Sequence, residues 1–416
     1  MIRKDLFLHD LAVVAILKDE GHYLKEWLDY HLLAGVNHFY LYDNDSTDNQ
    51  AEVAAPYVKA GLVDYIHFPG KVMQMPAYND AVKKFKFHCR YMAFIDLDEF
   101  IYPKSLRSIV EVVDEILLQN LNAAGLKINW QCFGSNGHDK ADYSRGVLER
   151  FTRRAPNAWF LGTLERVEEG NIFVKFIANP RRVDYISDPH SASYLESFYD
   201  ITENGKKFLG GVVYPVNTEK IVVNHYYLKS REEFMIKKMP RGWPCSGKVP
   251  YNHEQFVSYD RNEVFDDGIL KYRAARAENF SLENDAEKFN RVIEALTETL
   301  SDYAAGKTFS LETALTCRAL STNLREKFPN DSTRWRVYEE ASLAAILKSL
   351  YGMNFTDARL LIRELPILLS LPYSCVEEIR RDSVKIISWM KDTCRLNDAW
   401  KTFFELDYLQ DILKLT

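Results

Sequence analysis

The stretch RYMAFIDLDEFIYP, Arg90 to Pro103, runs an apolar segment directly into three carboxylates. The apolar residues 91–95 predict a buried β-strand, and Asp96, Asp98 and Glu99 follow at once. Carboxylates this close together repel one another and resist burial, so the arrangement requires positive charge nearby. Residues i and i+2 of a strand point to the same side, so we expect Asp96 and Asp98 to face together.

The first hundred residues alternate between strand and helix patterns. Apolar runs predict strands, and residues 22–35 carry Leu24, Trp27, Leu28 and Leu32 at helical spacing before Gly35. Such alternation predicts an α/β fold of GT-A-like Rossmann type, with a mostly parallel sheet covered by helices on both faces. The expected strands are 11–17, 38–43, 62–68 and 91–95, and the expected helices are 22–35, 48–60 and 77–89.

Polar residues follow three of these strands. Lys18, Asp19 and Glu20 follow the first strand, DNDSTD (43–48) ends the second, and DLDE (96–99) ends the fourth. Parallel sheets bind ligands at the carboxyl ends of their strands, so these residues predict a site at one sheet edge. The alternative for DNDSTD alone is an ordinary turn with a helix cap.

Two adjacent carboxylates at a sheet edge suit a hard divalent cation, Mn²⁺ or Mg²⁺. Such a cation can offer open positions to phosphate oxygens. One alternative is an exposed strand end with solvated acids. Another is a D-x-D phosphatase with Asp96 as nucleophile, but Phe100 follows Glu99 and the motif lies on the fourth strand rather than the first.

The pattern changes twice further along the chain. Residues 124–133 and 220–228 predict strands between loops rich in aromatic residues, and from 276 onward only helical periodicity remains. We therefore expect a catalytic domain over 1–275 and a helical domain over 276–416. The helical domain could bind a partner, form a dimer, or hold the protein near a lipid-linked acceptor.

Composition excludes several classes of protein. The chain has 416 residues and a formal net charge of −6, which does not predict a nucleic-acid surface. The N-terminus does not resemble a secretory signal, and no apolar run reaches the ~18 residues of a membrane span. The six cysteines form no C-x-x-C pair, which is typical of reduced, buried thiols. We expect a cytoplasmic protein, either free or peripheral to the inner face of the membrane.

Several motifs together resemble those of the bacterial family 2-like and family 92-like glycosyltransferases of GT-A type. They occur in family order over roughly residues 10–242, and the helical tail adds nothing to the match. The motifs are VAILKDEGHYLKEWLDYHLLAGVNHFYLYDNDSTD (14–48), DLDEF (96–100), NWQCFGSNGH (129–138), ERFTRR (149–154), VKFIANPRRV (174–183) and NHYYLKSREEF (224–234).

The resemblance implies transfer of a sugar from a nucleotide diphosphate to a glycan, glycoprotein or glycolipid. UDP-galactose is the first choice of donor and UDP-glucose the second. The FGSNGH loop would face the donor sugar and the acceptor, although its residues alone favour a plain turn. By position, Asp43 would bond the uracil or ribose with Asp19 close by, and Gln74 and Tyr78 would lie near the nucleoside. Asp96 and Asp98 would meet the metal and the ribose. Glu99 would support the site or the acceptor.

NHYYLKSREEF adds a histidine and a lysine. His225 can complete a metal shell, and Lys229 offers a point charge to a diphosphate. Ser230 and Glu233 form an S-x-x-E capping box, which predicts a helix whose positive N-terminal end favours phosphate. A satisfied core histidine is the alternative for His225, and His190 competes with it as metal ligand.

Related families mostly invert the anomeric carbon, which requires a carboxylate base for the acceptor hydroxyl. A metal would hold the pKa of Asp96 and Asp98 too low for that role. Asp188 is the candidate, in a loop we expect to be irregular, and a simple turn role is the alternative. Glu165 and Glu99 are the reserves. A catalytically inactive, transferase-like sugar-binding module remains a further hypothesis of function.

Overall fold

The computed structural model describes residues 2–161, 168–242, 246, 251–278, 280–350 and 354–393. Contacts divide the chain into two compact units. The sheet unit comprises His9–Tyr194 and Phe198–Asp285, and the helical unit comprises Met1–Leu8, Leu195–Ser197 and Ala286–Thr416. The predicted boundary at 275 falls within helix α9, Gly268–Ala277, whose Ile269 and Tyr272 belong to the core of the sheet unit. The division into two independent domains stays a prediction.

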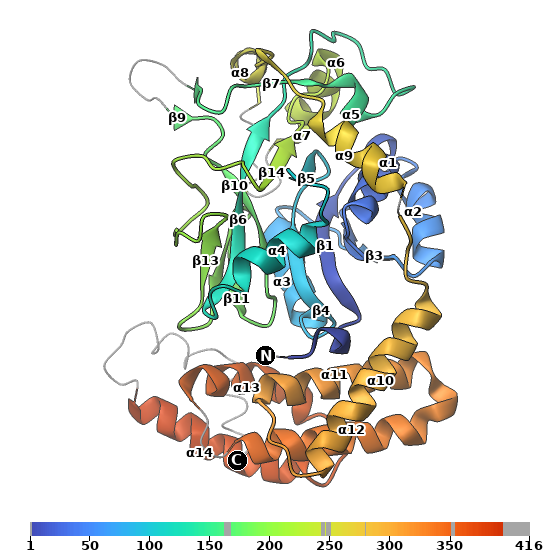
Figure 1. The fold of residues 1–416 in the computed structure, drawn as a ribbon, viewed down its shortest axis with the longest axis vertical. Coiled ribbons are helices and arrows are strands. Elements are labelled where there is room, and N and C mark those ends of the chain that lie inside the picture. The colour runs from blue at the N-terminus through green and yellow to red at the C-terminus, as the bar shows by residue number, and fades with distance from the viewer. Residues whose placement is uncertain are drawn as a thin grey trace. The chain divides into compact units, whose positions relative to one another are not determined.

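A nine-stranded mixed sheet forms the sheet unit (Figure 1), in the order β3-β2-β1-β4-β10-β6-β14-β5, with β13 paired to β6. The first four strands are parallel, and β10 is antiparallel to both β4 and β6. The predicted α/β class is therefore confirmed. The strands are β1 His9–Leu17, β2 His38–Asp43, β3 Val63–His67, β4 Cys89–Phe94, β5 Glu99–Pro103, β6 Ala123–Cys132, β10 Val174–Ala178, β13 Tyr199–Thr202 and β14 Ile221–His225.

Two hydrophobic layers cover the sheet because side chains alternate along each strand. Leu11, Val13 and Ala15 of β1 join one layer, while Ala12 and Val14 join the other. Burial on both faces explains why β1 reads as one continuous apolar run. The first layer is completed by α1 (Gly21–Leu33), α2 (Gln50–Lys59), α4 (Ile109–Leu117) and α9, and the second by α3 (Gln74–Phe85).

Several elements differ from what the sequence predicts or were predicted only in part. The segment expected to be an irregular loop around Asp188 is a β-hairpin of β11 (Val183–Asp188) and β12 (Ser191–Tyr194). Residues 231–241 form one continuous helical segment, α6 (Arg231–Glu233), the π-helix η2 (Phe234–Lys238) and α7 (Met239–Arg241). The other short elements are η1 Lys4–Leu6, α5 Val147–Arg150, β7 Arg153–Arg154, β8 Phe160–Leu161, β9 Glu168–Glu169, α8 His253–Tyr259 and β15 Val264–Phe265.

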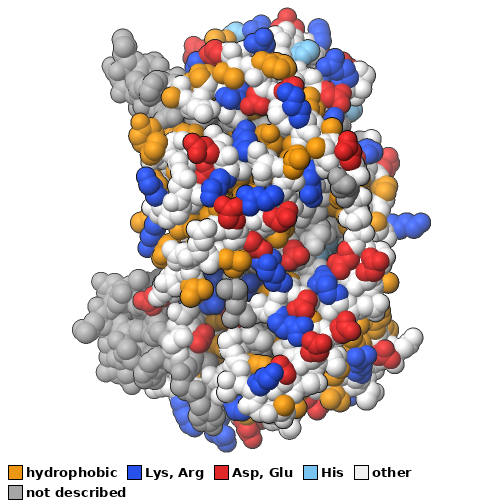
Figure 2. All heavy atoms as spheres, viewed as in Figure 1, with side chains coloured by type: hydrophobic (Ala, Val, Ile, Leu, Met, Phe, Trp, Pro, Cys, Tyr) orange, Lys and Arg blue, Asp and Glu red, His pale blue; other side chains and the backbone are white. Residues whose placement is uncertain are grey.

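The helical unit contains only helices among its described elements beyond residue 285. Its core includes Val292, Leu296, Cys317, Leu320 and Trp335. None of the described helices is long and apolar enough to cross a membrane. The face in Figure 2 intersperses acidic and basic side chains. The helices are α10 Asp285–Ala304, α11 Leu311–Lys327, η3 Pro329–Asp331, α12 Ser332–Ser349, α13 Phe355–Leu368 and α14 Val376–Thr393.

The described cysteines are free thiols. Cys89, Cys132 and Cys317 are buried, and Cys375 is partly buried. Burial raises the pKa of each buried thiol to about 12, which makes it a poor nucleophile. Cys245 and Cys394 lie outside the described residues.

Candidate active site

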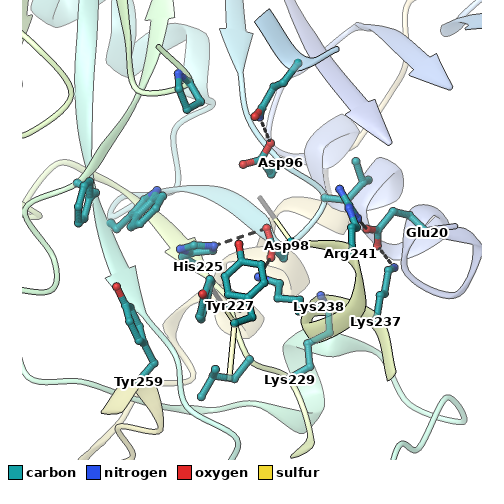
Figure 3. Close-up of a pocket in the computed structure, with 18 of the residues that line it drawn as sticks. Glu20, Asp96, Asp98, His225, Tyr227, Lys229, Lys237, Lys238, Arg241 and Tyr259 are labelled. Atoms are coloured by element: carbon teal, nitrogen blue, oxygen red, sulfur yellow. Dashed lines mark hydrogen bonds and ion pairs between the residues drawn. The ribbon is translucent and has the colours of Figure 1, made fainter. Parts of the chain in front are cut away.

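A cavity of about 360 Å³ opens at the carboxyl ends of the strands in the sheet unit. Its walls come from the end of β1, the turn after β4, β6, the β11–β12 hairpin, the end of β14, the helical segment 231–241 and α8. Figure 3 shows Asp98 near the centre of this cavity, between the His225 imidazole and the Lys238 ammonium. The strand ends thus meet at one site, where parallel sheets usually bind ligands.

The D-x-D residues occupy a turn, not the end of a strand. β4 ends at Phe94 and β5 begins at Glu99, whose N–H donates to the carbonyl of Asp96 at 3.1 Å. Asp96 and Asp98 both line the cavity, and so does Leu97, although its side chain is only 4% exposed and packs into the core. Asp96 and Asp98 therefore lie on the same side, as expected, but a tight turn rather than the pleat of a strand brings the two carboxylates together.

Asp96 is held by a buried lysine. Lys175 Nζ, on β10, donates to Asp96 Oδ2 at 2.8 Å, and Gln74 Nε2 donates to Oδ1 at 2.8 Å. Burial alone would raise the pKa of Asp96, but the Lys175 ammonium outweighs it and holds that pKa below its usual value. Asp96 therefore stays ionised at neutral pH. Tyr78 OH lies 3.4 Å from the same Oδ1 but is fully buried behind it and does not line the cavity.

Asp98 contacts a second lysine and a histidine. Lys238 Nζ lies 2.6 Å from Oδ2, and His225 Nε2 lies 3.6 Å from Oδ1. Burial would raise the pKa of Asp98, yet these neighbours hold it well below the usual range. Burial lowers the pKa of His225, partly opposed by Asp98, so its imidazole is neutral at pH 7 and can offer a lone pair to a cation.

Glu99 completes the carboxylate cluster without reaching the cavity. Its side chain is fully buried, and its Oε2 accepts from the Asp96 N–H at 2.9 Å. Burial raises the pKa of Glu99 to about 8, despite Lys175 Nζ at 3.4 Å. The clustered acids are thus stabilised by two lysines and one retained proton. Glu99 supports the turn from behind, and this position does not suit the role of reserve base.

The helical segment 231–241 supplies most of the cavity's positive charge. Lys237 pairs with Glu20 at the N-terminus of α1, and Arg241 Nη1 lies 3.0 Å from the same carboxylate. Two consecutive residues, Lys237 and Lys238, both reach cavity carboxylates across the π-helical turn, a kind of turn often found at functional sites. Burial lowers the pKa of Lys237 to about 8, although Glu20 opposes this.

Lys229 lines the cavity, with Nζ 4.3 Å from the centre of the Tyr23 ring, and its contact with a diphosphate stays a prediction. The capping box that follows is confirmed, because Ser230 Oγ accepts from Glu233 N and Glu233 Oε2 accepts from Ser230 N. The expectation that this helix end favours phosphate is wrong. The next N–H groups, of residues 231 and 232, donate to the carbonyls of residues 138 and 139, which leaves this end no N–H for an anion.

The hairpin places Asp188 and His190 on the cavity wall. Asp188 Oδ1 accepts from His190 N at 2.7 Å, so this residue combines the turn role with a position in the cavity. His190 Nδ1 lies 2.9 Å from the Val174 carbonyl, and burial lowers the pKa of its imidazole to about 4. Trp130 contacts both imidazoles, with ring centroids 5.1 Å from His190 and 4.2 Å from His225. Of the two, His225 is the one paired with Asp98.

The remaining predicted residues lie elsewhere. Asp19 Oδ1 accepts from Thr47 N, and Asp43 Oδ1 accepts from Ser46 N, so both carboxylates fasten the 43–50 loop and neither lines the cavity. Their contacts with a nucleoside stay a prediction. Gln74 does line the cavity. Glu165 lies outside the described residues.

The FGSNGH loop does not face this cavity. Ser135 N donates to Asp260 Oδ1 at 2.7 Å, and Asn136 N donates to Asn262 Oδ1 at 2.8 Å. The loop is therefore fastened to the segment after α8, and none of its residues lines the cavity. The expected contact with donor sugar and acceptor is not seen here, because Asp260 and Asn262 satisfy the turn's N–H groups.

The site's fit to a divalent cation is partial. Within the residues that the structure describes, no three His, Cys, Asp or Glu groups converge as a metal cluster. Asp98 and neutral His225 form a suitable pair of oxygen and nitrogen donors, with Asp96 on the same turn. A cation there would replace the Lys238 ammonium on Asp98 and take its other ligands from substrate and water. Asp98, His225 and Asp96 therefore suit an ion that takes its remaining ligands from a bound diphosphate and from water.

Glu20, predicted at the sheet edge, does line the cavity, but the sequence did not point to Lys175, Lys237, Lys238 or Arg241. Lys175 did leave a signal, since it interrupts the apolar strand VKFIA, where a lysine needs a buried partner. The other cations follow the capping box within one helical stretch, but only the π-helical register shows that neighbouring lysines turn to the same cavity. The aromatic residues Tyr227, Tyr251 and Tyr259 were also missed.

The profile of Glycosyltransferase family 92 matches residues 14–270. A glycosyltransferase family 92 protein of Ricinus communis is 27% identical over 147 residues, 35% of this chain and 26% of that protein. A galactan β-1,4-galactosyltransferase of Arabidopsis thaliana is 31% identical over 100 residues, 22% of this chain and 19% of that protein. The matched stretches thus span about a quarter or less of these plant proteins. The bacterial origin suggested by the resemblance stays a prediction.

Solved structures add a weaker likeness. The complex of S. aureus TarS 1-349 with UDP covers 93% of this chain and 91% of that chain, at 14% identity and a TM-score of 0.28. A TM-score this low supports no conclusion about ligands of the present chain.

Proposed function

We propose that this chain, which belongs to glycosyltransferase family 92, moves a hexose from a UDP-sugar to a carbohydrate-bearing acceptor in a metal-dependent reaction. Galactose is the first choice and glucose the second, and the name of the Arabidopsis galactosyltransferase supports that order. One observation carries the proposal. A single cavity brings the D-x-D carboxylates and His225 together with four cationic side chains.

The cations suit the diphosphate of such a donor. The cavity is lined by four cationic side chains, Lys229, Lys237, Lys238 and Arg241, and by no other lysine or arginine among the described residues. Phosphate oxygens accept strong, charge-assisted hydrogen bonds from ammonium and guanidinium groups. The nucleoside would lie toward Ile16, Gln74 and Asp96, where the end of β1 meets α3.

Asp98 and His225, with Asp96 beside them, would hold Mn²⁺ or Mg²⁺. The ion would neutralise charge that develops on the leaving diphosphate. The chain's own residues would supply the rest: Lys175 keeps Asp96 ionised and oriented, and Lys238 is freed from Asp98 to meet a phosphate. This exchange preserves the charge balance of the buried site.

We assign the base to Asp188, as the sequence suggested. It lines the cavity from the hairpin, on a different element from the lysines that hold Asp96 and Asp98 ionised. Its Oδ1 is oriented by the His190 N–H, which fixes the carboxylate without adding a cation. A carboxylate so placed can accept the proton of an acceptor hydroxyl during a single, inverting displacement.

Thermal unfolding with UDP, UDP-galactose and UDP-glucose, each with and without Mn²⁺, tests the proposal. We expect protection by UDP-sugars that requires the metal, and slow release of the hexose when acceptor is absent. Asp98→Asn should lose the protection, whereas Asp139→Asn, an exposed acid outside the cavity, should keep it. Protection of neither protein by any UDP-sugar would refute a donor site. Protection without sugar release would instead favour an inactive binding module.

A further inference from the structure

One wall of the cavity is aromatic. Tyr227, Tyr251 and Tyr259 line it together with Trp130. The ring centroids of Tyr227 and Tyr259 are 4.8 Å apart, and those of Tyr227 and Tyr251 are 5.9 Å apart. In Figure 3, Tyr227 and Tyr259 lie on one side of Asp98, and Glu20, Lys237 and Arg241 lie on the other. The cavity is thus divided into a cationic side and an aromatic side.

The aromatic side adjoins the catalytic centre directly. Trp130 packs against His225, with ring centroids 4.2 Å apart, and His225 faces Asp98. The centroid of the Tyr227 ring lies 5.4 Å from that of His225 and 3.8 Å from Lys238 Nζ. A ligand lying on these rings would therefore reach the groups proposed to hold the donor's diphosphate.

The rings are held in place by their surroundings rather than by a ligand. Gln255 Nε2 donates to Tyr227 OH at 2.9 Å, and the Trp159 ring packs edge-on against Tyr259, with centroids 5.7 Å apart. Leu228, Phe234 and Phe256 form the core behind them. Rigid tyrosines provide contact area at a low cost in conformational entropy. The wall is preorganised, and its rings remain partly exposed to the cavity.

We propose that Trp130, Tyr227, Tyr251 and Tyr259 form the subsite for pyranose rings of a carbohydrate acceptor. The inference rests on the proposed function and adds the residues of the cavity wall on which the sugar rings of the acceptor would lie. A pyranose has apolar C–H faces that stack on aromatic rings and a rim of hydroxyls that the tyrosine hydroxyls and Gln255 can bond. Four rings offer more surface than the single hexose of a donor can cover, so the wall suits a chain of sugars.

Other acceptors fit this wall less well. The rings are recessed in a cavity, where a flat membrane surface cannot reach them. A lipid chain would need a continuous apolar lining, but the cavity places Asp98, Asp188 and Gln255 among the aromatic residues. Polar and aromatic groups mixed in this way are typical of a ligand with apolar faces and a polar edge.

Tyr259 allows a matched test because it lies farther along the wall than Tyr227, which contacts Lys238. Tyr259→Phe keeps the ring, and Tyr259→Leu keeps an apolar side chain but removes the ring face. The probes are β-1,4-galactotetraose, cellotetraose, mannotetraose and chitotetraose, titrated calorimetrically with UDP and Mn²⁺ present. Tyr185→Ala, an exposed tyrosine outside the cavity, is the control.

We expect at least one tetrasaccharide to bind, and its affinity to fall about tenfold or more in Tyr259→Leu but to stay within about twofold in Tyr259→Phe. The inference is overturned if none of the four binds, or if the Leu variant binds as tightly as the Phe variant. A separate UDP titration reports the donor site. Tetrasaccharide binding without UDP binding would support the acceptor subsite and refute the donor proposal. UDP binding without tetrasaccharide binding would support the donor proposal and refute the acceptor subsite.

Discussion

The acidic and the cationic sides of the cavity are built in different ways. Asp96 and Asp98 stand on a short turn between two buried strands, β4 and β5. Lys237, Lys238 and Arg241 stand on a helical segment that contains a π-helical turn. In this structure the two sides pair with each other, Lys238 with Asp98, and Lys237 and Arg241 with Glu20.

The difference shows what each side contributes. The acids are fixed by the sheet and by Lys175, whose ammonium is almost fully buried. The cations sit on a separate segment, where Lys238 neutralises Asp98, a proposed metal ligand, and Lys237 and Arg241 neutralise Glu20. We expect donor and metal to exchange these partners, so that the metal takes Asp98 while the cations take the diphosphate. Charges buried together must remain balanced, and the exchange satisfies that requirement.

Removing the central acid should have the largest effect. Asp98→Asn keeps the shape of the side chain but removes the charge that a metal needs, so we expect kcat for transfer to fall about 10³-fold. The metal-dependent part of UDP affinity should disappear, while UDP binding in chelator changes little. Steady-state kinetics and calorimetry with Mn²⁺ or excess chelator measure both quantities. Full turnover of the unaltered enzyme in excess chelator would disprove metal dependence.

Asp188 belongs to neither side, and its loss should separate binding from chemistry. Asp188→Asn removes the proposed base but can still accept the His190 N–H bond. We therefore expect kcat to fall about 10²-fold, with UDP and metal affinities nearly unchanged. The anomeric configuration of the product, read by NMR, is the second measurement. Retained configuration would exclude a single displacement, and normal kcat would remove Asp188 from the mechanism.

The cationic side should show itself in affinity rather than in the chemical step. Lys237→Gln removes one of the charges proposed to face the diphosphate, so we expect UDP affinity at pH 7 to fall about tenfold. Burial lowers the pKa of Lys237 to about 8, so the ammonium loses its proton as pH rises through that value. UDP affinity of the unaltered protein should therefore decline above about pH 8.

Titrations from pH 6.5 to 9.5 test this decline. Lys237→Gln should show a flatter profile, because it lacks the titrating group. Lys140→Gln, which replaces an exposed lysine, is the matched control and should follow the unaltered protein. An equal decline in all three proteins would mean that Lys237 does not face the diphosphate.

The same contrast explains how far the sequence could be interpreted. Continuous apolar runs predicted β1, β2 and β4 within a few residues, because strands buried on both faces admit few polar side chains. The polar ends of β1 and β4 marked the correct sheet edge. The turn that carries the D-x-D was mistaken for a strand end, because Ile95 and Leu97 are as apolar as the strand itself.

The cationic and aromatic sides escaped sequence reasoning for another reason. Helical periodicity separates consecutive residues by about 100°, so it cannot anticipate that Lys237 and Lys238 serve one cavity. Tyr259 and Trp130 are more than a hundred positions apart, and only tertiary packing brings them to the same cavity. The protonation of Glu99 likewise depends on burial and on its neighbours, which local sequence does not report.

Glu99 gives the smallest expected effect, and it tests the interpretation of the acidic side. Its pKa is raised from an ordinary value of 4.5 to about 8, so the folded protein holds a proton there that the unfolded chain releases. Between these values the folded state binds more protons, and stability must fall as pH rises. Glu99→Gln mimics the protonated form and should remove this fall. We expect kcat at pH 7 within about twofold of normal, since Glu99 does not line the cavity.

Urea unfolding measures the effect of Glu99→Gln on stability. Relative to the unaltered protein, the variant's free energy of unfolding should rise by on the order of 1–3 kcal/mol between pH 5 and pH 8. A large loss of kcat with normal stability would instead place an ionised Glu99 in the reaction, and the acidic side would then hold three charges rather than two.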